Sequence, residues 1–270
     1  MPRPTPGETS TLARVIVAIP WAVLGGALIY VGGTVFAVAV IAFGVVALGE
    51  LYRMLAPARP IAIAGFAGLA GLVLSARFGD QFQMVLVLVL TFFGTFVLAV
   101  ARRHRRHVTI AMAATLFGVL WIGLALSHAV LLRELEHGGA LLTNTLIATF
   151  LGDTGAYFGG RYWGVHPLAP RISPAKTVEG LIAGIAVGTI AFWFAGLYQD
   201  WLSHGEALLI GLCVAVAAPL GDLFESLVKR DLGVKDTGRL FGEHGGVLDR
   251  LDAAFFAVVV GYYASNGLLY

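Results

Sequence analysis

Carboxylates interrupt an otherwise strongly apolar sequence at four places. Asp153 lies within one long apolar run, Asp222 and Glu225 lie near the end of another, and Asp249 and Asp252 begin the last one. An ionised carboxylate in hydrocarbon costs several kcal/mol unless it is paired or coordinates a cation. Carboxylate oxygens are ligands that suit a hard cation such as Mg²⁺. These residues therefore predict a polar site at one face of a membrane.

The spacing of the last four acids places them in pairs. Asp222 and Glu225 are three residues apart, as are Asp249 and Asp252, so each pair shares one face of its helix. Two such faces that meet would repel each other unless positive charge lay between them. Helix-end ion pairs are the alternative, for example Glu225 with Lys229 one turn later.

A charged, glycine-rich segment, KRDLGVKDTGRLFGEHGGVLDR at 229–250, joins these two acidic pairs. Its glycines let backbone amides approach phosphate oxygens, and its Lys and Arg side chains supply charge and donors. Gly245 and Gly246 stand just before the last apolar run, where a helix start offers unpaired amides to an anion. The composition is typical of a polyphosphate site.

A second polar segment, RYWGVHPLAPRISPAKTVEG at 161–180, is expected on the same side of the membrane. Ser173 and Pro174 are placed as the N-cap and first residue of the next helix, which is a purely structural alternative for Ser173. Lys176 would then lie in the first turn, where the helix dipole disfavours a cation, so we expect an anionic partner for it. Together with Asp153, the two polar segments are expected to form one cytoplasmic pocket.

The elements that position these residues are predicted to be membrane helices. Of 270 residues 58% are apolar and 13% charged, about half the charge of a soluble domain. The apolar residues form runs of the ~20 residues that cross ~30 Å of hydrocarbon. We expect an all-α integral membrane protein, a polytopic helical bundle of about nine transmembrane helices, with eight or ten as alternatives. The predicted spans are 15–32, 34–52, 61–76, 83–101, 108–127, 139–159, 178–197, 206–227 and 252–269.

The basic residues predict the orientation of this bundle. With the N-terminus in the cytoplasm, all 18 Lys and Arg residues except Arg77 and Arg133 fall in cytoplasmic segments. We therefore expect a multi-pass protein of the cell (inner or plasma) membrane, with its active site facing the cytoplasm. The basic run 102–107 is then an orientation signal rather than a nucleic-acid site. The predicted parts are a disordered tail (1–14), about five N-terminal helices (15–138), and a catalytic region (139–270) with cytoplasmic loops at 160–177 and 228–251.

Glycine and cysteine residues lead to two further expectations. Gly180, Gly184 and Gly188 recur at four-residue spacing, which lets helices approach closely within the chain and is also compatible with a homodimer. The single cysteine, Cys213, excludes an internal disulfide and a cysteine metal cluster, and we expect it to be buried and inert.

The segment 226–252 resembles the signature of the phosphatidate cytidylyltransferases, also called CDP-diacylglycerol synthases. The matching residues are Ser226, Val228, Lys229, Arg230, Lys235, Asp236, Gly238, Phe241, Gly242, His244, Gly245, Gly246, Val247, Asp249, Arg250, Leu251 and Asp252. The resemblance extends upstream to Asp153, Ala156, Tyr157, Ser173, Pro174, Lys176, Thr177, Glu179, Gly180, Gly221, Asp222 and Glu225. Ala175 departs from the family, which commonly has a second Lys beside Lys176.

The resemblance implies a Mg²⁺-dependent reaction of CTP with phosphatidic acid from the membrane lipid, giving CDP-diacylglycerol and pyrophosphate. Asp222 and Asp249 are the first candidates for cation ligands, and a second cation is compatible with the number of acids. Candidates for the remaining ligands are Asp153, Glu225 and Asp252. Candidates for binding the phosphates of CTP or lipid are Ser173, Lys176, Ser226, Lys229, Arg230, Lys235, Arg239, Gly245, Gly246 and Arg250. His244 is a candidate acid for the leaving pyrophosphate, with a purely positional role as the alternative.

Two other functions fit parts of this pattern. A CTP-dependent lipid kinase would use the same nucleotide and cation but attack the γ-phosphorus. A transporter of an anionic solute would use buried acids along a path across the membrane, whereas the acids here gather toward one face. The motif of the CDP-alcohol phosphotransferases is absent from the sequence.

Overall fold

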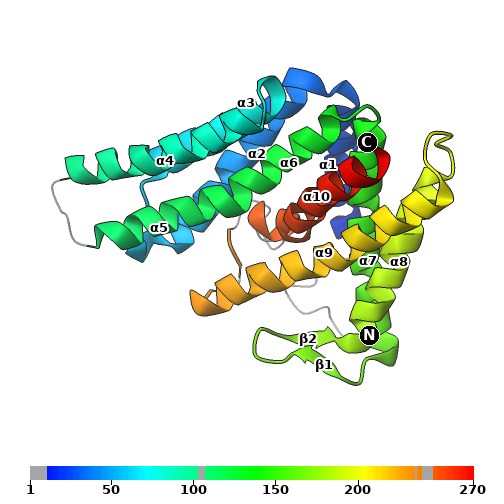
Figure 1. The fold of residues 1–270 in the computed structure, drawn as a ribbon. Helices are drawn as coiled ribbons and strands as arrows, with labels where there is room; N and C mark the ends of the chain where they lie inside the picture. Colours follow the sequence, from blue (N-terminus) through cyan, green and yellow to red (C-terminus); the bar gives the residue numbers. More distant parts are fainter. Residues whose placement is uncertain (1–10, 103–106, 235, 239–245) are drawn as a thin grey trace.

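The computed structural model describes residues 11–102, 107–234, 236–238 and 246–270. Within these residues the chain is mainly helical, and its two strands form one short hairpin (Figure 1). The helices are α1 (Thr11–Val31), α2 (Gly33–Met54), α3 (Ala62–Phe78), α4 (Gln81–Ala101), α5 (Val108–Gly118), α6 (Leu124–Glu134), α7 (Gly138–Trp163), α8 (Val178–Gly196), α9 (His204–Asp231) and α10 (Leu248–Leu269). The remaining elements are the 3-10 turn η1 (Ala56–Ala58), the π-helical turn η2 (Val119–Gly123), β1 (Pro167–Ala169) and β2 (Ser173–Thr177).

Each predicted span coincides with a helix of the structure. The fifth span is longer than predicted, because η2 joins α5 and α6 into one continuous rod that ends at Glu134. Six helices in the described chain are long and apolar enough to cross a membrane, when α5 to α6 is taken as one continuous helix. They are α2, α4, α5 to α6, α8, α9 and α10. The chain is thus an all-α membrane protein with several membrane-spanning helices.

The helices form two groups that share one core. Helices α2 to α6 pack together, α7 to α9 pack together, and α10 contacts members of both groups (Figure 1). Fully buried side chains run from Leu48 of α2 through Ile122 of η2 to Phe255 of α10. This continuous core fixes the N-terminal helices relative to the C-terminal region that carries the predicted site.

Glycines make the contact between α7 and α8 close, as the four-residue spacing predicts. A Cβ atom added to Gly184 would lie 2.9 Å from the carbonyl oxygen of Gly152, and one added to Gly188 would lie 3.0 Å from that of Ala148. Gly180 faces the backbone of Ala156 in the same way, at 2.7 Å. These glycines therefore serve packing within the chain, and they give no support to a homodimer.

The segment before α8 forms a β-hairpin that the sequence analysis did not predict. Ser173 is not the N-cap of α8, because it belongs to β2; the cap is Thr177, whose Oγ1 accepts a hydrogen bond from the amide of Gly180 at 3.1 Å. Lys176 also lies in β2 and not in the first helical turn. The hairpin is held by Glu179, whose carboxylate accepts the amides of Val165 at 3.1 Å and His166 at 3.2 Å.

The expectation that Cys213 is buried is wrong. The thiol is exposed on α9 and is not buried. Its neighbours Leu209 and Val216 are also exposed large apolar residues. The apolar run around Cys213 is therefore partly an outward-facing surface of the helix, as expected where a spanning helix meets lipid.

Candidate active site

Four residues of the predicted site occupy one face of α9. Asp222, Glu225, Ser226 and Lys229 follow one another at spacings of three, one and three residues, which keeps them on adjoining turns of the same face. The Ser226 hydroxyl donates to Asp222 Oδ1 at 3.4 Å. The last three turns of α9 therefore present acids, a hydroxyl and an amine in one direction.

Lys229 links α9 to α10. Its ammonium donates to Glu225 Oε2 at 2.8 Å and to Asp249 Oδ1 at 2.9 Å. The Glu225 side chain is 1% exposed, and those of Asp249 and Lys229 are 12% and 17% exposed. The alternative ion pair considered for Glu225 is thus present, but its lysine is shared with the first turn of α10. A shared ammonium keeps two buried carboxylates from repelling each other.

Asp249 is the most extensively bonded of the acids. Its Oδ2 accepts from the amide of Gly246 at 2.7 Å, from the amide of Thr237 at 3.0 Å and from the Thr237 hydroxyl at 2.8 Å. Its Oδ1 faces Lys229. Asp249 therefore fixes Thr237 and Gly246, which lie on either side of 239–245, to the start of α10. Its Oδ1 points toward the acidic face of α9.

The hairpin brings a second lysine to α9. Lys176 Nζ lies 2.5 Å from Asp222 Oδ2, so the anionic partner expected for Lys176 is a carboxylate of the site itself. Arg230 Nε donates to the carbonyl oxygen of Ile172 at 3.2 Å, next to Ser173 at the turn of the hairpin. These contacts dock the hairpin across the end of α9.

Asp153 and Asp252 complete the acidic group. The carboxylates of Asp153, Asp222 and Asp252 lie close enough to interact electrostatically, and so do those of Asp252 and Glu225. Asp252 Oδ1 also accepts the amide of Ala253 at 2.7 Å. The five predicted acids are therefore gathered where the C-terminal halves of α7 and α9 meet the start of α10.

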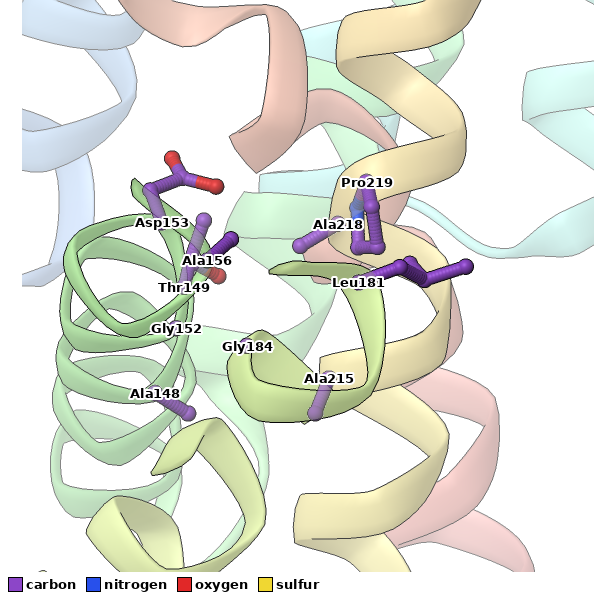
Figure 2. A pocket seen from close by; sticks show the side chains of 10 residues that line it. All are labelled: Ala148, Thr149, Gly152, Asp153, Ala156, Leu181, Gly184, Ala215, Ala218 and Pro219. Atoms are coloured by element: carbon purple, nitrogen blue, oxygen red, sulfur yellow. The ribbon is translucent and has the colours of Figure 1, made fainter. Parts of the chain in front are cut away.

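An apolar recess adjoins this group at Asp153. Small residues of α7, α8 and α9 line this small recess, which is partly open to the outside (Figure 2). Pro219 breaks the regular hydrogen bonding of α9 at its wall, because proline has no amide proton to donate. Polar and apolar surfaces thus meet at Asp153.

The charge balance of the group fits a cation. Five carboxylates face only two lysine ammoniums, Lys176 and Lys229, in the contacts described above. Among the described residues, no three His, Cys, Asp or Glu side chains are arranged to enclose a metal ion by themselves. Mg²⁺ in nucleotide sites is usually held by one or two carboxylates, with phosphate oxygens and water as the other ligands. A pair of these acids is therefore sufficient.

Two of the remaining predicted site residues have a place in the described structure. Arg250 is exposed on the first turn of α10, and Ser173 lies in β2. Lys235, Arg239, His244 and Gly245 fall outside the described residues.

Two residues of the site were missed by the sequence analysis. Thr237 lies within the glycine-rich segment and bonds to Asp249 through both its amide and its hydroxyl. Glu50 lies far away in the sequence, in α2, and its Oε2 accepts the amide of Leu248 at 2.9 Å. A lone carboxylate in the apolar run 34–52 needs an explanation as much as Asp153 does. That argument could have identified Glu50 from the sequence.

Several proteins with assigned names are similar in sequence to this chain. A phosphatidate cytidylyltransferase of Bacillus subtilis is 31% identical over 266 residues, covering 93% of this chain and 96% of the relative. Proteins of the same name from Mycobacterium leprae and Helicobacter pylori are 39% identical over 150 residues and 38% identical over 126 residues. Those matches cover 56% and 46% of this chain, and 48% and 46% of the relatives.

The chain thus spans about half the length of these two relatives. A sequence model described as the cytidylyltransferase family matches residues 12–267, almost the whole chain. The chain therefore belongs to the cytidylyltransferase family.

Proposed function

We propose that the chain transfers CMP from CTP to phosphatidic acid, giving CDP-diacylglycerol and pyrophosphate. The names of its relatives support this substrate pair. The observation that carries the proposal is the position of Lys229 between Glu225 and Asp249, beside the Lys176–Asp222 pair. This arrangement brings three separate polar segments to one end of the bundle, next to an apolar recess.

The reaction needs positioning and charge neutralisation more than covalent help from the protein. A phosphate oxygen of phosphatidic acid attacks the α-phosphorus of CTP, and the bond from that phosphorus to the pyrophosphate oxygen breaks. Lys176 and Lys229 lie where they can bind phosphate oxygens, with Ser226 beside them. The further proposed phosphate contacts are Ser173, Arg230, Lys235, Arg239, Gly245 and Arg250.

Gly246 acts through Asp249 in this proposal. Its amide donates to Asp249 Oδ2 at 2.7 Å, so its proposed contribution is to orient that carboxylate. The proposed acid for the leaving pyrophosphate remains His244.

Asp222 and Asp249 are the proposed Mg²⁺ ligands. Each has an oxygen that faces a lysine ammonium, Asp222 Oδ2 toward Lys176 and Asp249 Oδ1 toward Lys229. A bound Mg²⁺ would neutralise the triphosphate and its developing charge. Asp153, Glu225 and Asp252 are the proposed ligands of a second cation or the groups that orient the first two.

The proposed orientation places this site at the cytoplasmic edge of the cell membrane, with nine helices crossing and the N-terminus inside. Contacts between helix ends support it. The two basic residues expected outside share one end of the bundle, where Arg133 Nε donates to Ile29 O at 2.6 Å and Arg77 pairs with Glu134 at 3.3 Å. Arg102 and Arg59 are expected inside. Arg102 Nη1 donates to the carbonyl oxygen of Arg59 at 2.8 Å, at the ends of other helices.

Product analysis tests the proposed reaction. Purified protein in detergent micelles, given CTP, phosphatidic acid and Mg²⁺, should release pyrophosphate and form CDP-diacylglycerol in equal amounts. Release of CDP with a phosphorylated lipid would instead identify a lipid kinase. Absence of pyrophosphate with CTP and with other nucleotides would refute the proposal, provided that the protein is monodisperse.

A further inference from the structure

Glu50 is an acid buried in α2, far in sequence from the acidic group described above. Its side chain is 0% exposed. No ion pair joins it to a Lys, Arg or His side chain among the described residues. Burial of a carboxylate without hydrogen bonds is costly, so the partners of Glu50 indicate what it is for.

Among the described residues, the partners of the Glu50 carboxylate belong to the glycine-rich segment or to the start of α10. Oε2 accepts the amide of Leu248 at 2.9 Å and lies 3.5 Å from the Thr237 hydroxyl. Leu248 is the first residue of α10, and its amide is one of those that a helix start leaves unpaired. A carboxylate at this position also interacts favourably with the helix dipole.

Two glycines let Glu50 come this close. A Cβ atom added to Gly238 would lie 2.5 Å from Glu50 Oε1, and one added to Gly246 would overlap the carboxylate of Glu50. Gly238 and Gly246 are the last described residues on either side of 239–245. Glu50 thus contacts the chain on both sides of 239–245. This contact explains the need for glycine at Gly238 and Gly246.

These contacts lead directly to Asp249. The Thr237 hydroxyl lies between Glu50 Oε2, at 3.5 Å, and Asp249 Oδ2, at 2.8 Å. Gly246 contacts Glu50 and donates its amide to Asp249. Leu248, bonded to Glu50, directly precedes Asp249 in the chain. Three separate connections therefore join the Glu50 carboxylate to the position of the Asp249 carboxylate.

We propose that Glu50 is a positioning residue that holds Thr237, Gly246 and the first turn of α10 in place, and so sets the position of Asp249. The N-terminal helices then contribute to the site through α2. The effect of Glu50 on turnover rests on the proposed function, whereas its effect on the backbone of the segment does not.

Hydrogen–deuterium exchange tests the structural part of the proposal. Glu50→Ala should raise exchange at least tenfold in peptides that contain Thr237 and 246–249, because the amide of Leu248 loses its acceptor. Leu51→Ala is the matched control, since Leu51 is also 0% exposed on α2 and its replacement opens a similar cavity. Unchanged exchange in Glu50→Ala, or an equal rise in Leu51→Ala, would refute the proposal.

Kinetics test the functional part. A displacement of Asp249 by about 1 Å should lower kcat roughly 100-fold in Glu50→Ala while KM for CTP changes less than about threefold. Glu50→Gln keeps an acceptor for Leu248 and should restore kcat to within about fivefold of the unmodified protein. A normal kcat in Glu50→Ala would overturn the inference. If the unmodified protein forms no CDP-diacylglycerol, the proposed function fails, and the exchange data still decide the role of Glu50.

Discussion

Lys229 and Asp249 are held 2.9 Å apart, which joins the end of α9 to the first turn of α10. The same ammonium bonds Glu225, so a single lysine balances two carboxylates that are nearly inaccessible to solvent. This relationship makes Lys229 both a structural link and a phosphate-binding candidate. The two roles predict different results when its partners are changed.

Lys229→Met should lower both stability and turnover. It leaves Glu225 and Asp249 without their shared cation, and removal of one partner from a buried ion pair costs about 3–5 kcal/mol. Removal of a second charge in Lys229→Met/Glu225→Gln should recover much of the unfolding temperature, measured by scanning fluorimetry in detergent. Turnover should stay low in the double variant. Recovery of both properties together would show that Lys229 is only structural.

Asp249→Asn should abolish turnover while the protein remains folded. The amide still accepts from Gly246 or Thr237, but it places a neutral group against Lys229 and removes charge from the proposed cation site. We expect a loss of at least about 100-fold in kcat, the size found when a group that stabilises the transition state is removed. Asp231→Asn, an exposed acid at the end of α9, should retain normal activity. Near-normal turnover by Asp249→Asn would remove Asp249 from the site.

The helices could be predicted from the sequence because hydrocarbon thickness imposes a run of about 20 apolar residues, a constraint that needs no knowledge of neighbours. The pairs Asp222–Glu225 and Asp249–Asp252 followed from helical periodicity in the same way. The hairpin 167–177 did not, because its strands are short and carry no alternating pattern of apolar residues. They pair with each other, and the Glu179 carboxylate fixes the residues just before them. The N-cap therefore moved from Ser173 to Thr177.

Contacts between distant segments were also beyond the sequence. Glu50 and Leu248 are 198 residues apart, and no periodicity relates them. Lys176 and Asp222 belong to a hairpin and a helix whose docking depends on their three-dimensional arrangement. The sequence predicted which residue types form the site, whereas the pairing of each lysine with a carboxylate required the structure.

Chelation should stop the reaction if the acids hold Mg²⁺. Excess EDTA should abolish pyrophosphate release, and added Mg²⁺ should restore it, since two carboxylates and the triphosphate otherwise repel each other. In Asp222→Asn the Mg²⁺ concentration for half-maximal activity should rise at least about tenfold, because one of two protein ligands loses its charge. Lys176, freed from that carboxylate, should still support CTP binding. Full activity in EDTA would contradict the metal proposal.

Gly184→Ala should destabilise the packing of α7 against α8. Its Cβ atom would lie 2.8 Å from the Cβ of Ala156 and 2.9 Å from the carbonyl oxygen of Gly152, so α7 and α8 must separate. Overpacking of this kind typically costs about 1–3 kcal/mol, which should appear as a lower unfolding temperature in scanning fluorimetry. Gly94→Ala on α4 is the control, because nothing lies within 4 Å of its added Cβ atom. That variant should be as stable as the unmodified protein or slightly more so, since alanine favours a helix over glycine. Equal stability of both variants would show that the α7–α8 contact tolerates a wider spacing than the structure has.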